Sequence, residues 1–142
     1  MIKKIMTVFL FLFVFLLVGC STKITWEDNI VNDIKMIEEN GFEASAYNSL
    51  TNLEDLNKQL NMEIKQEGYE FEIKLTKIAH FFEVGSVSDY VFFRQFETEE
   101  QTNNYYALLS RPNRQYKMFK SDTILIYATS EKAMNLLDYK FE

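Results

Sequence analysis

The stretch YEFEIKLTKIAHFFEVGSVSDYVFFRQF, residues 69–96, decides the fold class. Its first eight residues alternate between apolar or aromatic side chains and charged or polar ones. Successive side chains of a strand point to opposite faces, so this alternation predicts a half-buried strand over residues 69–76. Residues 78–84 are mainly apolar, Gly85 and Ser86 interrupt them, and residues 90–96 predict a second strand that is apolar on both faces.

Helical periodicity replaces the alternation on both sides of this stretch. Apolar residues three or four positions apart predict one helix between Thr25 and Gly41, and another from the capping box at Thr51 to Gly68. A third helix is expected from Thr98 to Arg111. A hairpin over residues 115–128, turned at Ser121-Asp122, and a short helix capped by Ser130 follow.

The predicted order is helix, an ambiguous segment at residues 42–47, helix, two strands, helix, two strands and helix. Short connections between neighbouring strands favour antiparallel pairing, and this order of elements favours an α+β fold. We therefore expect a small antiparallel sheet with helices packed on one face, which is a two-layer sandwich. At 142 residues the chain has room for one such domain, over residues 26–142.

Residues 1–19 have a composition different from that of the rest of the chain. Lys3 and Lys4 form a short basic start, and residues 5–18 follow with Thr7 as their only polar side chain. A spanning helix needs about 20 apolar residues, so this run is short for a permanent membrane anchor. It is typical of the apolar part of a secretory signal peptide, which would form an N-terminal apolar helix.

Leu17-Val18-Gly19-Cys20 directly follows this run and resembles the lipobox of bacterial prolipoproteins. The resemblance implies that residues 1–19 are a signal peptide cleaved after Gly19, and that Cys20 carries a diacylglyceryl group on its sulfur. Residues 20–25 would then be the lipidated residue and a short tether. Two acyl chains would hold the protein at the cell membrane with its domain outside the cytoplasm. An uncleaved signal anchor with an incidental cysteine is the alternative.

The composition of the mature chain limits its function. Without residues 1–19 it has 13 basic and 21 acidic side chains, a net charge of −8, which argues against nucleic-acid binding. Cys20 is the sole cysteine, so no intramolecular disulfide is expected. With one histidine and no glycine-rich phosphate loop, we expect no metal site and no cofactor.

His80 and Glu83 are the only weak candidates for catalysis. On a helix their spacing of three would make them an acid–base pair. Within an apolar segment, His80 is more simply interpreted as a partly buried ring in a sheet. A non-catalytic domain that binds a protein or envelope component is therefore the main hypothesis. An envelope-acting enzyme or enzyme subunit that uses these two residues is the alternative.

Four basic residues within ten positions contrast with the acidic background: Arg111, Arg114, Lys117 and Lys120. They predict either a surface that orients the domain on anionic lipid or an acidic partner, or an edge strand protected by charge against pairing with other strands. Edge protection is the favoured interpretation. On a strand Lys117 would point away from the face shared by Arg114 and Lys120.

Overall fold

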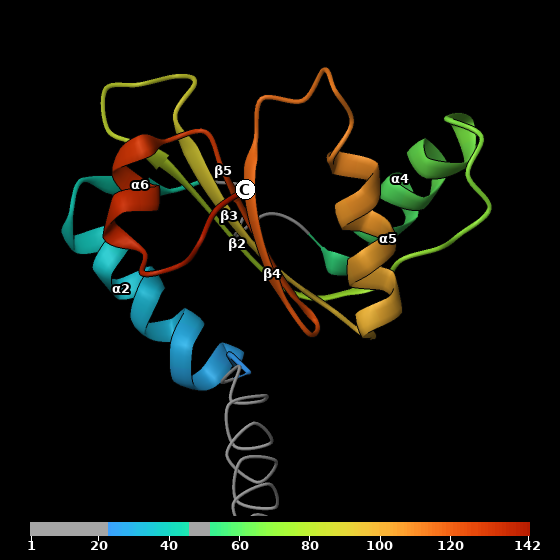
Figure 1. The fold of residues 1–142 in the computed structure, drawn as a ribbon, viewed down its shortest axis with the longest axis horizontal. Helices are drawn as coiled ribbons and strands as arrows, with labels where there is room; N and C mark the ends of the chain where they lie inside the picture. Colours follow the sequence, from blue (N-terminus) through green and yellow to red (C-terminus); the bar gives the residue numbers. More distant parts are fainter. Residues whose placement is uncertain (1–22, 46–51) are drawn as a thin grey trace, which may run out of the picture.

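A computed structural model describes residues 23–45 and 52–142, and these residues form a five-stranded antiparallel sheet with helices around it (Figure 1). The strand order is β1-β2-β3-β5-β4, and every neighbouring pair is antiparallel. The strands are β1 (Phe42–Ala44), β2 (Leu75–Glu83), β3 (Tyr90–Phe96), β4 (Lys117–Ser121) and β5 (Ile124–Ala128). The predicted α+β class and small antiparallel sheet are confirmed.

The helical elements are a π-helical turn η1 (Trp26–Ile30) that continues into α2 (Val31–Glu39), then α4 (Leu53–Gln66), α5 (Glu99–Leu109) and α6 (Glu131–Leu136). Polar side chains cap four of their N-termini by accepting a backbone N–H bond: Thr25, Asn52, Thr98 and Ser130. The caps predicted at Thr25, Thr98 and Ser130 are confirmed. Thr51, the expected first residue of the capping box, lies outside the described residues, and Asn52 caps α4.

The helices cover both faces of the sheet, so the prediction of helices on one face is wrong. One face carries α2 and α6, which share a core cluster with Phe93 and Ile126. The other carries α4 and α5, whose cluster contains Leu125 and Tyr127. All five residues of β5 are buried, and a strand that is apolar at successive positions needs cover on both sides. The sheet is therefore the middle of three layers (Figure 1).

The strand predicted over residues 69–76 is wrong for residues 69–74, because β2 begins at Leu75. The alternation of burial is nevertheless present, since Ile73 and Leu75 are buried whereas Glu72 and Lys74 are exposed. Side chains of α4, rather than a neighbouring strand, bind the backbone of this segment. An alternating pattern thus reports one buried face and does not by itself require a strand partner.

The two ends of the sheet differ in what they carry. At one end, named the entry end, the described chain begins: Lys23 Nζ lies 3.6 Å from Asp122 Oδ2 in the β4–β5 turn. The Lys77 ammonium lies 5.9 Å from the centre of the Trp26 ring at the same end. The opposite end, named the far end, carries the β2–β3 turn and the loop between α5 and β4. Figure 1 shows the entry end at the bottom and both far-end loops at the top.

Candidate functional site

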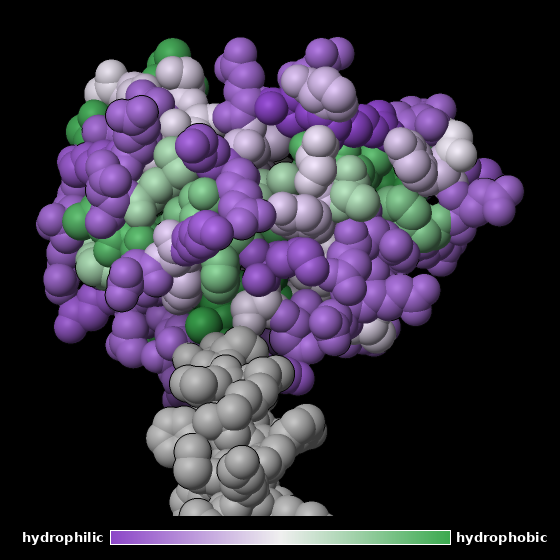
Figure 2. All heavy atoms as spheres, viewed as in Figure 1, coloured by the Kyte–Doolittle hydropathy of each residue, from purple (hydrophilic) through white to green (hydrophobic). Residues whose placement is uncertain are grey.

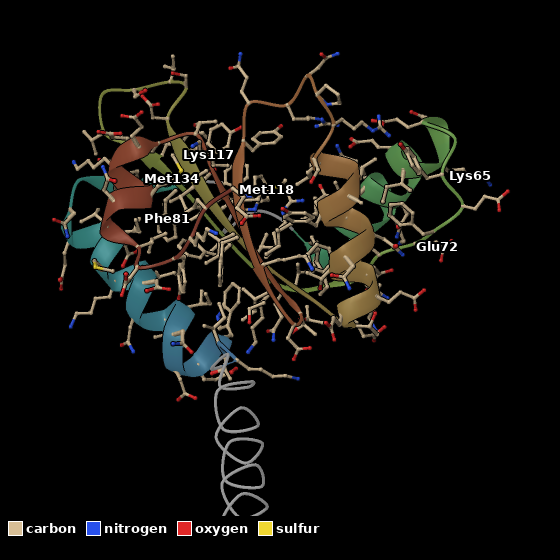
Figure 3. All side chains as sticks on the ribbon, in the orientation of Figure 1. Lys65, Glu72, Phe81, Lys117, Met118 and Met134 are labelled. Carbon is tan, nitrogen blue, oxygen red and sulfur yellow. The ribbon has the colours of Figure 1, made fainter. Side chains whose placement is uncertain are left out.

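The four basic residues of the predicted surface do not form one patch. Lys117 and Lys120 lie on opposite faces of the edge strand β4. Lys117 borders a hollow together with Met134 of α6 (Figure 3), whereas Lys120 Nζ donates to Asn103 Oδ1 of α5 at 2.6 Å. Arg111 and Arg114 lie in the loop after α5, at the far end. The two arginines therefore form a site separate from the two lysines.

Arg111 and Arg114 share one carboxylate, that of Glu67 after the end of α4. Arg111 Nη1 lies 2.6 Å from Glu67 Oε2, and Arg114 Nη2 lies 3.9 Å from Glu67 Oε1. About one third of each side chain is exposed, with values of 35%, 34% and 39% for Arg111, Arg114 and Glu67. Two cations around one carboxylate leave an excess positive charge, on a chain whose formal net charge is −6.

Tyrosine rings lie against both guanidinium groups. Arg111 Cζ is 4.7 Å from the centre of the Tyr69 ring, and Arg114 Cζ is 6.0 Å from that of Tyr116. Such contacts stabilise a cation and restrict the orientations of its side chain. A hydrogen bond with the Tyr116 hydroxyl is the main cause that raises the pKa of Arg114. The guanidinium group of Arg114 therefore stays charged in the folded protein.

Local sequence brings these residues together. Gly68 has a φ of +88° and ends α4 in a Schellman motif, in which its N–H donates to Lys65 O at 3.0 Å. The N–H of Tyr69 donates to Ile64 O at 3.1 Å and completes the motif. Beyond α5, the N–H of Arg114 donates to Arg111 O at 3.1 Å, which closes a tight turn. The end of α4 and this turn thus meet at the arginines.

A hollow of about 220 Å³ adjoins the arginine pair and reaches the edge of β4. Tyr106, Ser110, Tyr116 and Met118 contribute to its walls. Glu142 borders it as well, and its backbone pairs with Met118 through two hydrogen bonds of 2.9 Å, one in each direction. A segment of this chain therefore already lies along the outer edge of β4 as a neighbouring strand would.

Charged and polar side chains cover most of the face seen in Figure 2, where hydrophobic residues reach the surface only in limited areas. Exposed large hydrophobic residues nevertheless occur at the far end: Tyr69 is 37% exposed, Val84 59% and Val87 99%. Val84 and Val87 belong to the β2–β3 turn, apart from the arginine pair. They add apolar contact area to the far end without forming part of the site.

The structure does not bring His80 and Glu83 together, because the segment is a strand and not the helix on which they would form an acid–base pair. Both lie on β2, where a spacing of three points side chains to opposite faces. The His80 ring is 3% exposed and lies 4.1 Å from the Phe92 ring. Burial, and secondarily the charge of Arg94, lower the pKa of His80 to about 3, so the ring is neutral near pH 7. Glu83 accepts a hydrogen bond from Ser130 Oγ at 3.1 Å.

Sequence reasoning found the two arginines and missed Glu67, Tyr69 and Tyr116. Glu67 is 44 positions from Arg111, and no local pattern connects them. One signal was present: Glu67 stands at the C-terminus of a helix, where the helix dipole disfavours negative charge. An acidic residue directly before the glycine that ends a helix indicates a cationic partner from elsewhere in the chain.

Comparisons with known proteins identify no relative of this chain. No protein family matches it, and neither does any curated protein or solved structure.

The lipobox residues Leu17, Val18, Gly19 and Cys20 lie outside the described residues. None of the helices in residues 23–45 and 52–142 has the length and apolar character that a membrane span requires. Within these same ranges, no three His, Cys, Asp or Glu side chains are grouped so that they could hold a metal ion.

Proposed function

We propose that the protein is a lipid-anchored bacterial lipoprotein of the cell membrane. Its folded domain would be a non-catalytic module that binds a protein or envelope component outside the cytoplasm. The position of Lys23, where the described part of the chain begins, carries this proposal. Lys23 lies beside Asp122 at the entry end, whereas Arg111 and Arg114 lie at the far end.

A lipid on Cys20 would hold the entry end close to the bilayer. Three residue steps separate Cys20 from Lys23, and they span at most about 10 Å. The strands of the sheet run from the entry end to the far end, and β4 alone covers about 13 Å. The far end, with the arginine pair and the exposed valines, would therefore face away from the membrane and be accessible to partners.

Metabolic labelling tests the anchor. Cells that produce the wild-type chain should incorporate labelled palmitate into it, whereas Cys20→Ala should abolish labelling and leave unprocessed precursor. Ser21→Ala is the matched control, because it changes the neighbouring residue without removing the thiol, and it should label normally. Palmitate in the Cys20→Ala protein would contradict the lipoprotein proposal.

Site-specific crosslinking tests the binding role in intact membranes. A photoreactive residue at Asn113, in the loop that carries the arginines, should give crosslinks to protein or envelope material. The same residue at Ser121 at the entry end should crosslink mainly to lipid. Lipid crosslinks from both positions, with none to other components, would contradict a binding role for the far end.

The alternative of an envelope-acting enzyme that uses His80 and Glu83 has no support in the geometry. The two side chains point to opposite faces of the sheet, and the imidazole is buried against the ring of Phe92. A general base must lie within hydrogen-bond reach of the proton it removes, so this pair does not favour catalysis.

A further inference from the structure

We propose that Arg111 and Arg114 bind a carboxylate of an acidic peptide segment from a partner protein, and that Glu67 occupies this site when the partner is absent. The inference deepens the proposed binding function and rests on it, because the partner must approach the far end. It names the class of ligand and the residue that competes with it.

The arginine pair has more binding capacity than Glu67 uses. A guanidinium group carries five N–H donors in a planar fork that matches a carboxylate, and the two groups face a single carboxylate. Arg111 is within hydrogen-bond distance of Glu67, whereas Arg114 Nη2 is 3.9 Å away and interacts only through charge. An incoming carboxylate that displaces Glu67 would find donors on Arg114 that Glu67 does not use, beside the Tyr116 ring 6.0 Å away.

Glu67 is suited to be displaced. Its side chain is 39% exposed, and ion pairs at this exposure contribute little to stability. Its position at the end of α4 places its negative charge against the unfavourable end of the helix dipole. Release of Glu67 to solvent would therefore cost the fold little.

The edge of β4 favours an extended peptide as the source of the carboxylate. Glu142 is bound to Met118 through a reciprocal pair of backbone hydrogen bonds, so this edge already accepts an extended segment. Backbone groups two residues apart point to the same edge of a strand. The next such position toward the far end is Tyr116, which borders the same 220 Å³ hollow as Arg114. A peptide lying there would have an acidic side chain within reach of the arginines.

Fluorescence anisotropy tests the proposal with the full chain purified in neutral detergent. The probe is a fluorescein-labelled hexapeptide of alternating threonine and glutamate, and the same peptide with glutamine is its uncharged control. The glutamate peptide should bind saturably and the glutamine peptide should not. The double variant Arg111→Gln/Arg114→Gln should weaken binding by about ten-fold or more, because charge-assisted hydrogen bonds are removed.

Glu67→Gln provides the deciding measurement. Loss of the internal competitor should tighten peptide binding by up to about five-fold, the equivalent of the roughly 1 kcal/mol that an exposed ion pair contributes at most. Lys117→Gln/Lys120→Gln is the matched control for a loss of two positive charges, and it should leave binding unchanged. Thermal unfolding of each variant checks that the fold is retained.

Three outcomes would overturn the proposal. They are unchanged or weaker binding in Glu67→Gln, equal losses in the arginine and lysine double variants, and displacement of the peptide by inorganic phosphate at equal concentration. Unchanged or weaker binding in Glu67→Gln would exclude Glu67 as an internal competitor. Equal losses in the two double variants would indicate unspecific charge attraction, and displacement by phosphate would indicate a general anion site. Palmitate labelling at Cys20 does not depend on these residues, so either proposal can fail without the other.

Discussion

The side-chain amide of Asn61 binds both backbone polar groups of Ile73. The N–H of Ile73 donates to Asn61 Oδ1 at 2.8 Å, and Asn61 Nδ2 donates to Ile73 O at 2.8 Å. One helical turn earlier, Asn57 binds Leu75 in the same way, at 2.7 and 3.1 Å. Four residues of a helix and two residues of an extended chain each advance about 6 Å, so the two spacings match. Helix α4 thus takes the place of a neighbouring strand.

Removal of either asparagine amide should destabilise the protein. Asn57→Ala and Asn61→Ala each leave a partly buried N–H and C=O without their partner. We expect each change to lower the free energy of unfolding by about 1–3 kcal/mol. Urea unfolding measures this. Gln59→Ala is the control, because that exposed amide of the same helix bonds only to Glu63. If the two asparagine variants lost no more free energy of unfolding than Gln59→Ala, the asparagine amides would not stabilise the backbone at Ile73 and Leu75.

Elements with local signals could be predicted from the sequence, and those that depend on distant partners could not. The bounds of β3 match the predicted residues 90–96, because the flanking residues end the apolar run on both sides. The β4–β5 turn lies at Asp122 and Thr123, one residue beyond the predicted Ser121-Asp122. This turn and the cap at Thr98 also depend only on neighbouring residues. In contrast, the loss of strand pairing over residues 69–74 depends on asparagines from another helix.

The layer arrangement and the arginine site show the same limit. The apolar residues on both faces of strand β3 require cover on both sides of the sheet, and helices supply it on both faces. Arg111 and Arg114 stood out by charge alone. Their shared partner Glu67 could not be identified, because an ion pair between the ends of two helices leaves no periodic pattern.

Burial of His80 should make the protein less stable as the pH falls. The pKa of His80 is about 3 in the fold, against 6.5 in the unfolded chain, so below pH 6.5 protons bind preferentially to the unfolded state. The stability contribution is fully present above pH 6.5 and is lost progressively as the pH falls toward about 3. Between pH 7 and 5 the loss from this residue should be about 2 kcal/mol.

Comparison with His80→Gln isolates this effect, because glutamine does not titrate. The free energy of unfolding should be measured for both proteins at pH 7 and at pH 5. The wild type should lose more stability than the variant, and the difference between the two losses is the contribution of the imidazole. Equal losses of stability in the two proteins would show that folding does not lower the pKa of His80.

The domain should fold without residues 1–22 and without oxidation. A chain of residues 23–142 contains no cysteine, and two apolar clusters fill the layers on either side of the sheet. We expect a single cooperative transition in thermal unfolding, with the same midpoint in the presence and absence of reductant. A chain that stays unfolded on its own would show that folding depends on a partner or on the omitted residues.

The orientation of the domain on the membrane can be measured with two fluorescent labels. In the proposed lipoprotein the thiol of Cys20 carries the lipid, so a cysteine introduced by Ser121→Cys or Asn113→Cys is the only free thiol for labelling. Ser121 is the last residue of β4 and precedes Asp122, the partner of Lys23. Asn113 lies between the two arginines, at the opposite end of β4, which is about 13 Å long. Lipids with nitroxide headgroups should quench the fluorescence of the label at position 121 and leave the fluorescence of the label at position 113 unchanged.

This measurement also decides between the two surfaces considered for lipid contact. If Arg111 and Arg114 bound anionic headgroups, the label at Asn113 would be the quenched one, and only in vesicles that contain anionic lipid. Higher salt would then restore its fluorescence, because screening weakens such contacts beyond about 10 Å at 0.1 M salt. Quenching at Ser121 that is the same in neutral and anionic vesicles indicates that the lipid anchor alone sets the orientation. The arginine pair then faces outward, where an acidic peptide can displace Glu67.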